Sequence, residues 1–233
     1  MTSRAGVLPI LASFSVGVAV ASLYSYLCRK KEDRNNAGAV VEGNDLSLFY
    51  GNVSELTAIT ERRRFLPSEL YSKMVQDCVV CCVDCLLVRY NPALRRKECL
   101  LVLRASEPVK GVWWLPGGRL LKGETFFAAA VRKAKGETGL DAVRPVQVLG
   151  VWNTFFPTSH WDDDQSKGTQ TVNPIVLVEL EQPGADVVLD NTSEQFRWIP
   201  LDPDLAKANG EDRYVLQALY RLRAWNPSYD SYS

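Results

Sequence analysis

The chain has 233 residues, of which 46% are hydrophobic and 23% are charged, a composition typical of a folded globular protein. Lysine plus arginine and aspartate plus glutamate both number 27, so the formal net charge is zero and nucleic acid is not an expected partner. The chain has a single histidine, His160. A multi-histidine zinc site is therefore excluded, and any metal would be held mainly by oxygen or cysteine.

The amino-terminal region contains an uncharged apolar stretch over residues 6–28, which is long enough to cross the hydrocarbon core of a bilayer. Arg29, Lys30 and Lys31 follow at once, so the positive-inside rule places the rest of the chain in the cytosol. We therefore expect residues 1–31 to be a single-pass membrane anchor, in the endoplasmic reticulum or the mitochondrial outer membrane. A cleaved signal peptide is the alternative.

The remainder divides into a polar linker over residues 32–64, a domain over 65–225 and a loose tail over 226–233. Hydrophobic spacing and turn residues predict the order of helices and strands within the domain. This order indicates an α/β or α+β sandwich around a mixed sheet. The predicted elements are helices over 65–75, 125–135 and 214–223, and strands over 78–88, 98–104, 146–155, 171–179 and 196–199.

The central predicted helix has apolar residues at helical spacing. Phe127, Ala130, Val131 and Ala134 fall at i, i+3, i+4 and i+7, which predicts one buried stripe. Gly139 is suited to end the helix, because glycine adopts the left-handed conformation without a steric penalty.

Four cysteines, Cys78, Cys81, Cys82 and Cys85, fall within the apolar run over 78–88. Neighbouring residues of a strand point to opposite faces, so the four thiols would not converge on one ion. We expect these cysteines to pack as small apolar side chains rather than to bind a metal or form a redox pair.

A second motif contains Gly118, Glu124, Arg132, Glu137 and Gly139 at fixed intervals. These residues and spacings resemble the Nudix box, G-x5-E-x7-R-E-U-x-E-E-x-G-U, where U is aliphatic. The resemblance implies a Nudix-type α/β/α sandwich around a mixed sheet. It also implies a substrate in which a nucleoside diphosphate is linked to another group, and dependence on a divalent cation.

The residues of this motif have physical roles of their own. Glu124 and Arg132 are eight positions apart on nearly the same helix face, so they can pair and brace the preceding loop. Gly118 allows the main chain to approach a phosphate or metal closely. Glu137 offers an oxygen ligand suited to Mg²⁺.

Two positions depart from the box, because Lys133 and Gly136 stand where it has glutamates. One carboxylate, that of Glu137, remains where a full box gathers three. Activation by several metal ions of a water that attacks phosphorus is therefore not favoured. The GDP-mannose mannosyl hydrolases depart at the same two positions and cleave the sugar C–O bond, and the chain resembles that branch over roughly residues 65–219.

Carried over to this chain, the resemblance places one Mg²⁺ (or Mn²⁺) on the Gly117 carbonyl and the Glu137 carboxylate. Asp84 would contact the sugar. Guanidinium groups suit phosphate oxygens, so three arginines would neutralise charge on the departing nucleoside diphosphate. These are Arg104, Arg119 and Arg132, of which Arg119 and Arg132 are the candidates for a catalytic role.

The general base of the branch is missing. Thr192 and Ser193 stand where the branch has a Gln-His pair, and an unaided serine is not a base near neutral pH. Glu194 is one replacement, and His160, in a long loop with three aspartates at 162–164, is another.

We therefore expect a Mg²⁺-dependent hydrolase that cleaves a nucleotide-sugar resembling GDP-mannose and releases a nucleoside diphosphate and a sugar. Cleavage of the pyrophosphate of another nucleoside-diphosphate compound is one alternative. A catalytically weak protein that binds a nucleotide-sugar at a membrane is another. The resemblance also allows a homodimer, because members of the family often dimerise.

Overall fold

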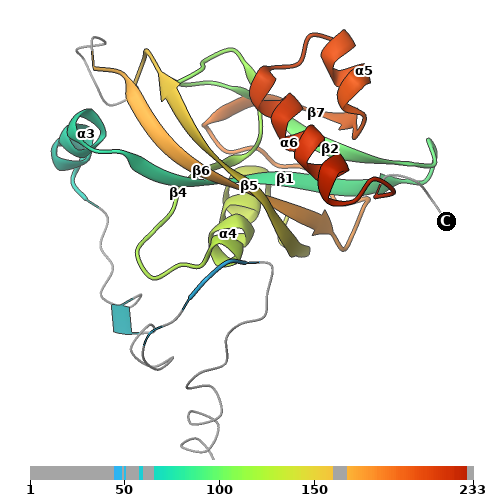
Figure 1. Cartoon of the computed structure of the whole chain (residues 1–233), viewed down its shortest axis with the longest axis horizontal. Coiled ribbons are helices and arrows are strands. Elements are labelled where there is room, and N and C mark those ends of the chain that lie inside the picture. Colours follow the sequence, from blue (N-terminus) through green and yellow to red (C-terminus); the bar gives the residue numbers. More distant parts are fainter. Residues whose placement is uncertain (1–44, 49, 51–57, 60–65, 160–166, 230–233) are drawn as a thin grey trace, which may run out of the picture. The chain divides into compact units, whose positions relative to one another are not determined.

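The computed structural model describes residues 45–48, 50, 58–59, 66–159 and 167–229. The chain divides into two units, residues 1–42 with 48–58 and residues 43–47 with 59–233. All elements named below belong to the second unit (Figure 1).

The predicted anchor over residues 1–31 and most of the predicted linker lie outside the described residues. In the part of the chain that the structure describes, no helix is both long enough and apolar enough to span a membrane.

A mixed seven-stranded sheet forms the centre of the second unit. Its two long middle strands, β1 (Val80–Asn91) and β6 (Thr169–Leu180), run parallel, whereas β5 (Val143–Phe156) pairs antiparallel with β6. The order is β3-β2-β1-β6-β5, with β4 paired to β1 and β7 paired to β2. The remaining strands are β2 (Arg96–Arg104), β3 (Trp113–Trp114), β4 (Gly117–Arg119) and β7 (Ser193–Pro200).

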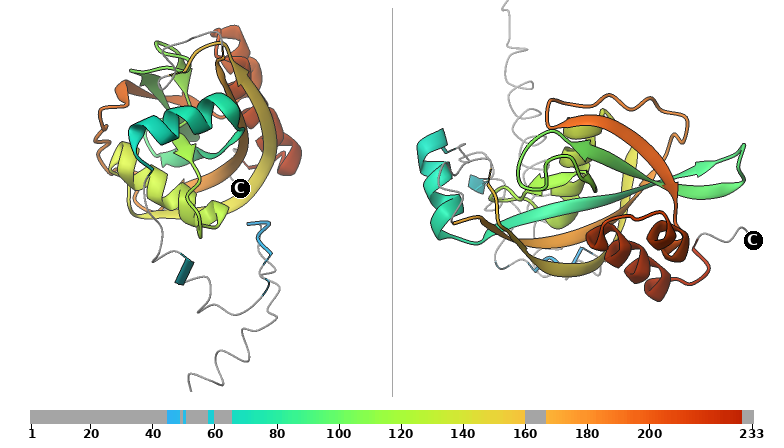
Figure 2. Two further views of the ribbon diagram at one scale, coloured as in Figure 1. Left: turned by 90° about the vertical axis from the view of Figure 1, so that its left-hand side faces the viewer. Right: turned by 90° about the horizontal axis from the view of Figure 1, so that it is seen from above.

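Helices cover the two faces of this sheet. Helix α4 (Phe126–Thr138) lies on one face, and α6 (Arg213–Trp225) lies on the other together with the short α5 (Pro203–Ala208), as the two views of Figure 2 show. Helix α3 (Ser68–Asp77) lies at the amino-terminal end of β1. The predicted mixed sheet between helical layers is confirmed.

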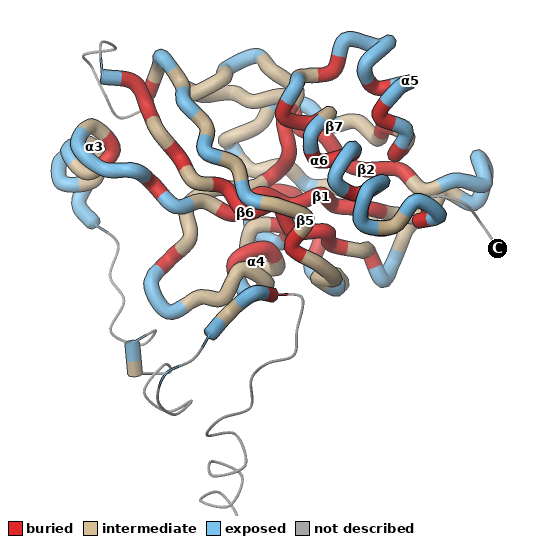
Figure 3. The backbone as a smooth tube through the Cα atoms, viewed as in Figure 1, coloured by how far each residue is buried: buried red, intermediate tan, exposed pale blue. Residues whose placement is uncertain are grey.

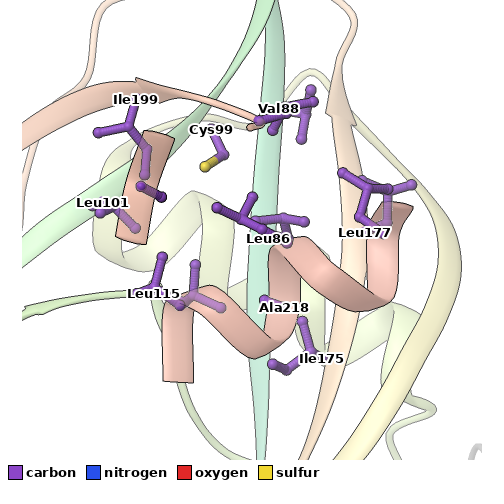
Figure 4. Packing of buried hydrophobic residues seen from close by; sticks show 14 of the residues in the cluster. Leu86, Val88, Cys99, Leu101, Leu115, Ile175, Leu177, Ile199 and Ala218 are labelled. Carbon is purple, nitrogen blue, oxygen red and sulfur yellow. The ribbon is translucent and has the colours of Figure 1, made fainter. Parts of the chain in front are cut away.

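The alternation of side chains along the strands produces two separate cores. In β1, Leu86 packs on the α6 side, whereas Cys85 and Leu87 pack on the α4 side. In β6, Leu177 packs on the α6 side, whereas Val176 packs on the α4 side. Because successive residues of a strand point to opposite faces, two apolar strands in the middle of the sheet supply both cores. Figure 3 shows the burial of these strands, and Figure 4 shows the core on the α6 side.

Helix α4 begins one residue later than predicted and continues three residues further, up to the predicted stop at Gly139. The hydroxyl of Thr125 accepts a hydrogen bond from the Ala128 N–H at the start, and Gly139 ends the helix with φ of 70°. The predicted buried stripe is wrong in part, since Ala130 is fully buried whereas Phe127 is only half-buried. The buried face of α4 therefore differs from the predicted stripe. It packs through the small residues Ala129, Ala130 and Ala134, and it also includes Glu137.

The other differences from the predicted elements are local. Strand β1 begins two residues later than predicted, at Val80, and each strand extends past its predicted range at one end or both. The extensions arise because pairing with neighbouring strands continues beyond the apolar run. Helix α5 and the short strands β3 and β4 had no prediction, since they are too brief to show a periodic pattern.

The prediction that the four cysteines at 78–85 pack as small apolar side chains is wrong in part, because only Cys85 is buried and Cys82 is half-buried. Strand β1 begins at Val80, and its first residues lie outside the two cores. Cys85 and Cys99 are fully buried in the two cores, whereas Cys78 and Cys81 are exposed. All of the cysteines in the described part of the chain are free thiols, and Cys28 lies outside it.

Candidate functional site

A pocket of about 510 Å³ opens at the amino-terminal ends of β1 and β6. Helix α3 borders it on one side, and β4 with the second half of α4 borders it on another. The loop after β2 and the residue before β7 complete the rim. Most of the residues singled out from the sequence line this pocket: Asp84, Arg104, Gly117, Gly118, Arg119, Arg132 and Glu137.

Asp84 lies at the floor of the pocket, in the middle of β1, and is 3% exposed. Its Oδ2 atom accepts a hydrogen bond of 2.8 Å from the Asn173 side chain of β6 and one of 2.6 Å from the Tyr214 hydroxyl of α6. The Asn173 amide oxygen in turn accepts from the Thr171 hydroxyl. Three elements distant in sequence therefore hold one carboxyl group in place.

Burial raises the pKa of the Asp84 carboxyl group to about 6, and the nearby Glu137 carboxylate adds to the rise. The hydrogen bonds from Tyr214 and Asn173 and the charge of Arg104 act in the opposite direction. Removal from water disfavours the charged form of an acid, and here this effect exceeds the effect of the donors. The group therefore titrates close to neutral pH, which is the range useful for moving protons.

Gly117 lies directly against this carboxyl group, since β4 pairs with β1 at Asp84. A Cβ atom at position 117 would lie 2.1 Å from Asp84 Oδ1 and 2.5 Å from the Val83 carbonyl oxygen. Only glycine permits this approach of two backbones, so Gly117 is required by packing as well as by any ligand.

Glu124 and Arg132 form the predicted brace. The guanidinium group of Arg132 donates to both carboxylate oxygens of Glu124, at 2.6 and 2.8 Å. It also donates to the Arg119 carbonyl oxygen at 3.0 Å, and Glu124 accepts from the Leu121 N–H. This bidentate pair ties the loop after β4 to α4.

Two other arginines are placed differently. Arg104, at the end of β2, donates through Nε to the Pro108 carbonyl oxygen, and the guanidinium of Arg119 lies 4.3 Å from the centre of the Tyr71 ring. Neither forms an ion pair with a residue that the structure describes. Both line the pocket, so their charges are available to an anion that enters it.

Both carboxylate oxygens of Glu137 accept a hydrogen bond. Its Oε1 accepts a 2.8 Å hydrogen bond from the Lys133 ammonium, and its Oε2 accepts a 2.9 Å bond from the Gly117 N–H. Lys133 and Glu137 are one helical turn apart, a spacing at which opposite charges meet.

This donor set does not fit a resident Mg²⁺ or Mn²⁺. Such ions take several oxygen ligands, and among the described residues no three histidine, cysteine, aspartate or glutamate side chains cluster closely enough to hold a metal. The carboxylate predicted as the ligand, that of Glu137, already neutralises an ammonium group. The family resemblance predicts a divalent ion here, but the described residues do not supply a set of ligands that would hold one as a resident cofactor.

Of the two candidate bases, the structure describes only Glu194, and it is not brought into this group. Glu194 lies on β7, is exposed, and is not among the residues that line the pocket, whereas its neighbour Thr192 lines it. His160 and the aspartates at 162–164 lie outside the described residues. A catalytic role for either remains a prediction.

The sequence prediction missed three residues of the site, Asn173, Tyr214 and Tyr71. One signal was present, because an asparagine in the apolar run of β6 marks a buried polar group that requires a partner. Tyr214 looked like any aromatic residue of an amphipathic helix. Its ring stacks on Trp114 at 4.4 Å between centroids, and that pairing comes only from the fold.

Comparison with known proteins gives one family. A family model described as the NUDIX domain matches residues 85–219. The low-salt glycan biosynthesis protein Agl8 of Haloferax volcanii is 31% identical over 102 residues, which cover 44% of this chain and 61% of that protein. The 8-oxo-dGDP phosphatase NUDT18 of Mus musculus is 41% identical over 54 residues, which cover 23% of this chain and 16% of that protein.

These matches therefore span less than two thirds of the length of either curated relative. Among solved structures, an Ap4A hydrolase of C. elegans in a binary complex aligns with a TM-score of 0.49 and 21% identity, over 65% of this chain and all of that one. The family model covers more than half of the chain, including most of β1, the whole motif and α6 up to Leu219. The chain belongs to the Nudix hydrolase family.

Proposed function

We propose that this protein hydrolyses a nucleotide-sugar of the GDP-mannose kind at the sugar C–O bond, releasing a nucleoside diphosphate and a free sugar. One observation carries the proposal. Arg104 and Arg119, with no ion-pair partner among the described residues, share a pocket with Lys133 and with the buried carboxyl group of Asp84. The pocket thus combines several cations suited to a diphosphate with a polar group suited to a hydroxyl-bearing ligand.

The choice of the C–O bond follows from the charges in the pocket. Attack on phosphorus requires a strongly activated water, commonly supplied by metal ions that several carboxylates hold. Here the corresponding carboxylate, Glu137, is paired with Lys133. Departure of a diphosphate from the anomeric carbon depends instead on stabilising the negative charge of the leaving group, and fixed cations in a partly buried pocket do this well.

The described residues have distinct roles under this proposal. Arg104 and Arg119 hold the diphosphate, while Arg132, braced by Glu124, keeps the loop that carries Arg119 in position. Asp84 contacts the sugar, where its raised pKa lets it accept or donate a hydrogen bond near neutral pH. Glu194 and His160 are the two candidates for the base that activates water, and mutation of each tests that role.

The relatives support the substrate class in one respect. The name of Agl8 refers to glycan biosynthesis, and pathways that build glycans use activated sugars. The name of NUDT18 refers to the phosphatase of an oxidised nucleotide, 8-oxo-dGDP. The first relative matches over nearly twice as many residues, and it favours the nucleotide-sugar.

The test is a product analysis with the full chain, a panel of nucleotide-sugars led by GDP-mannose, and separation of the products. GDP with free mannose supports the proposal. GMP with mannose 1-phosphate contradicts it and assigns pyrophosphate cleavage. Binding without turnover of any compound would instead indicate a nucleotide-sugar-binding protein.

Glu137→Gln makes the same test specific to the pocket. We expect the variant to lose about 10- to 100-fold in kcat/KM, because the Lys133 ammonium loses the carboxylate that holds it in place beside the leaving group. The matched control is Glu181→Gln, since Glu181 is exposed and outside the pocket. Unchanged turnover by Glu137→Gln would show that the chemistry takes place elsewhere.

A further inference from the structure

The ammonium group of Lys133 occupies the part of the pocket where the family resemblance places a metal ion. It lies 2.8 Å from Glu137 Oε1, the carboxylate predicted to be the ligand. It also lies against the glycine turn, since a Cβ atom built on Gly118 would be 2.7 Å from the Lys133 nitrogen and 3.8 Å from Glu137 Oε1. A positive charge is therefore already held between the glycine turn and the end of α4.

This cation has capacity left to bind a ligand. An ammonium group carries three N–H donors, and the structure records one hydrogen bond for it among the described residues, the bond to Glu137. Lys133 lines the pocket, and its side chain retains 21% of its exposure. Two donors are thus available to phosphate oxygens.

The surrounding charges favour an anion over a second cation. Four basic residues line the pocket, namely Arg104, Arg119, Arg132 and Lys133, against three acidic ones, Asp84, Glu107 and Glu137. Arg132 is paired with Glu124 and Lys133 with Glu137, whereas Arg104 and Arg119 have no ion-pair partner among the described residues. Glu107 accepts a hydrogen bond from the Thr158 hydroxyl. A divalent cation would have to displace Lys133 and remain close to several guanidinium groups, which is costly in a partly buried site.

We propose that Lys133 is the resident cation of this pocket and binds a nucleoside diphosphate directly, in the place of a divalent metal ion. Glu137 then acts as a positioning residue that holds the ammonium group toward the ligand. The proposal rests on the proposed function in one respect, since both require a diphosphate to enter this pocket.

Titration calorimetry of the full chain with GDP tests the proposal, in a buffer with EDTA and in a buffer with Mg²⁺. We expect dissociation constants that agree within about threefold in the two buffers, because the resident charge is an ammonium. Lys133→Gln should weaken binding in EDTA by about tenfold or more, the effect of removing a charge-assisted hydrogen bond. Lys133→Arg, which keeps the charge, should retain binding in EDTA.

The matched control is Lys135→Gln on the same helix. Lys135 is exposed, lies outside the pocket and forms only a loose pair with Asp141 at 3.7 Å, so binding should not change. Far-UV circular dichroism and thermal unfolding show whether each variant is folded, and Lys133→Arg tests the charge if Lys133→Gln is not.

A direct metal measurement completes the test. Electron paramagnetic resonance with Mn²⁺ alone should show weak binding to the natural protein and tighter binding to Lys133→Glu, which places a second carboxylate beside Glu137. Binding of GDP only in the presence of Mg²⁺, or tight Mn²⁺ binding by the natural protein, would overturn the proposal and leave the proposed function standing. No GDP binding in either buffer would overturn both.

Discussion

The hydroxyl group of Tyr214 donates a 2.6 Å hydrogen bond to the carboxyl group of Asp84, a residue 130 positions earlier in the chain. The bond joins α6, on one face of the sheet, to the floor of the pocket. Burial and the neighbouring Asp84 raise the pKa of the Tyr214 hydroxyl, so it remains a donor at every pH at which the protein is studied. This hydrogen bond therefore links the hydrophobic core on the α6 side of the sheet to the floor of the pocket.

Removal of this donor should destabilise the protein and shift the titration of Asp84. We expect Tyr214→Phe to lower the free energy of unfolding by about 1–3 kcal/mol, because a buried acceptor loses one of its two partners. The pKa of Asp84 should rise further above about 6, since the hydrogen bond from Tyr214 lowers it. Urea unfolding measures the first effect. Tyr220→Phe, at a more exposed position of the same helix, is the control and should change little.

The stability of the protein should depend on pH through Asp84. Its pKa is raised from an ordinary value of 3.8 to about 6, so the folded protein keeps a proton that the unfolded chain releases. The resulting stability is present in full below about pH 4 and is lost as the pH rises through about 6, in total about 3 kcal/mol. The difference in unfolding free energy between the natural protein and Asp84→Asn should therefore fall between pH 4 and pH 8. Asp186→Asn, at an exposed position, should show a constant difference.

The brace between Glu124 and Arg132 should be sensitive to a conservative substitution. Lysine cannot reproduce the two hydrogen bonds of the guanidinium group, so we expect Arg132→Lys to lower the unfolding free energy by about 1–2 kcal/mol. Turnover should fall as well, because the loop that carries Arg119 loses its tie. The comparison is Arg223→Lys in the exposed Arg223–Asp204 pair, where little change in stability is expected because solvent screens the two charges. Equal effects at the two positions would contradict a bracing role.

Substitution by alanine should have different effects at two glycines of the motif region, impairing ligand binding at one and raising stability at the other. Gly118→Ala should impair diphosphate binding, because the new Cβ atom would lie 2.7 Å from the Lys133 nitrogen and the backbone has φ of +151°. Gly136 lies in α4, and a Cβ atom added there would have nothing within 4 Å, so Gly136→Ala should stabilise the protein by about 0.5–1 kcal/mol. Calorimetry with GDP and thermal unfolding of both variants distinguish the two effects.

The apolar stretch over residues 6–28 is open to a separate test. If it spans a bilayer, the full chain should stay with membranes during alkaline carbonate extraction. Val18→Arg places a charge at the centre of the stretch, at a cost of about 2.5–3.5 kcal/mol to insertion, and should release part of the protein. Val40→Arg, beyond the stretch, should release none. Full extraction of the natural chain would contradict an anchor.

Local rules accounted for the elements and for contacts close in sequence. The apolar runs predicted β1 and β6, and Gly139 ends α4 as expected. The pairing of Glu124 with Arg132 was predicted and is present, although Glu124 precedes α4 and reaches Arg132 from the loop. These features depend on neighbours within a few turns of the chain, and so they can be read from the order of residues alone.

The order of residues was thus sufficient to identify the family, the mixed sheet and a basic, glycine-containing motif with one surviving carboxylate. How that carboxylate is used became clear from the folded chain, in which the inward face of α4 directs Glu137 toward Lys133 and the Gly117 N–H. The network of Asp84, Asn173 and Tyr214 likewise forms only when three distant segments meet. The physical reason is burial, since a buried polar group takes whichever partner the packing of distant elements supplies.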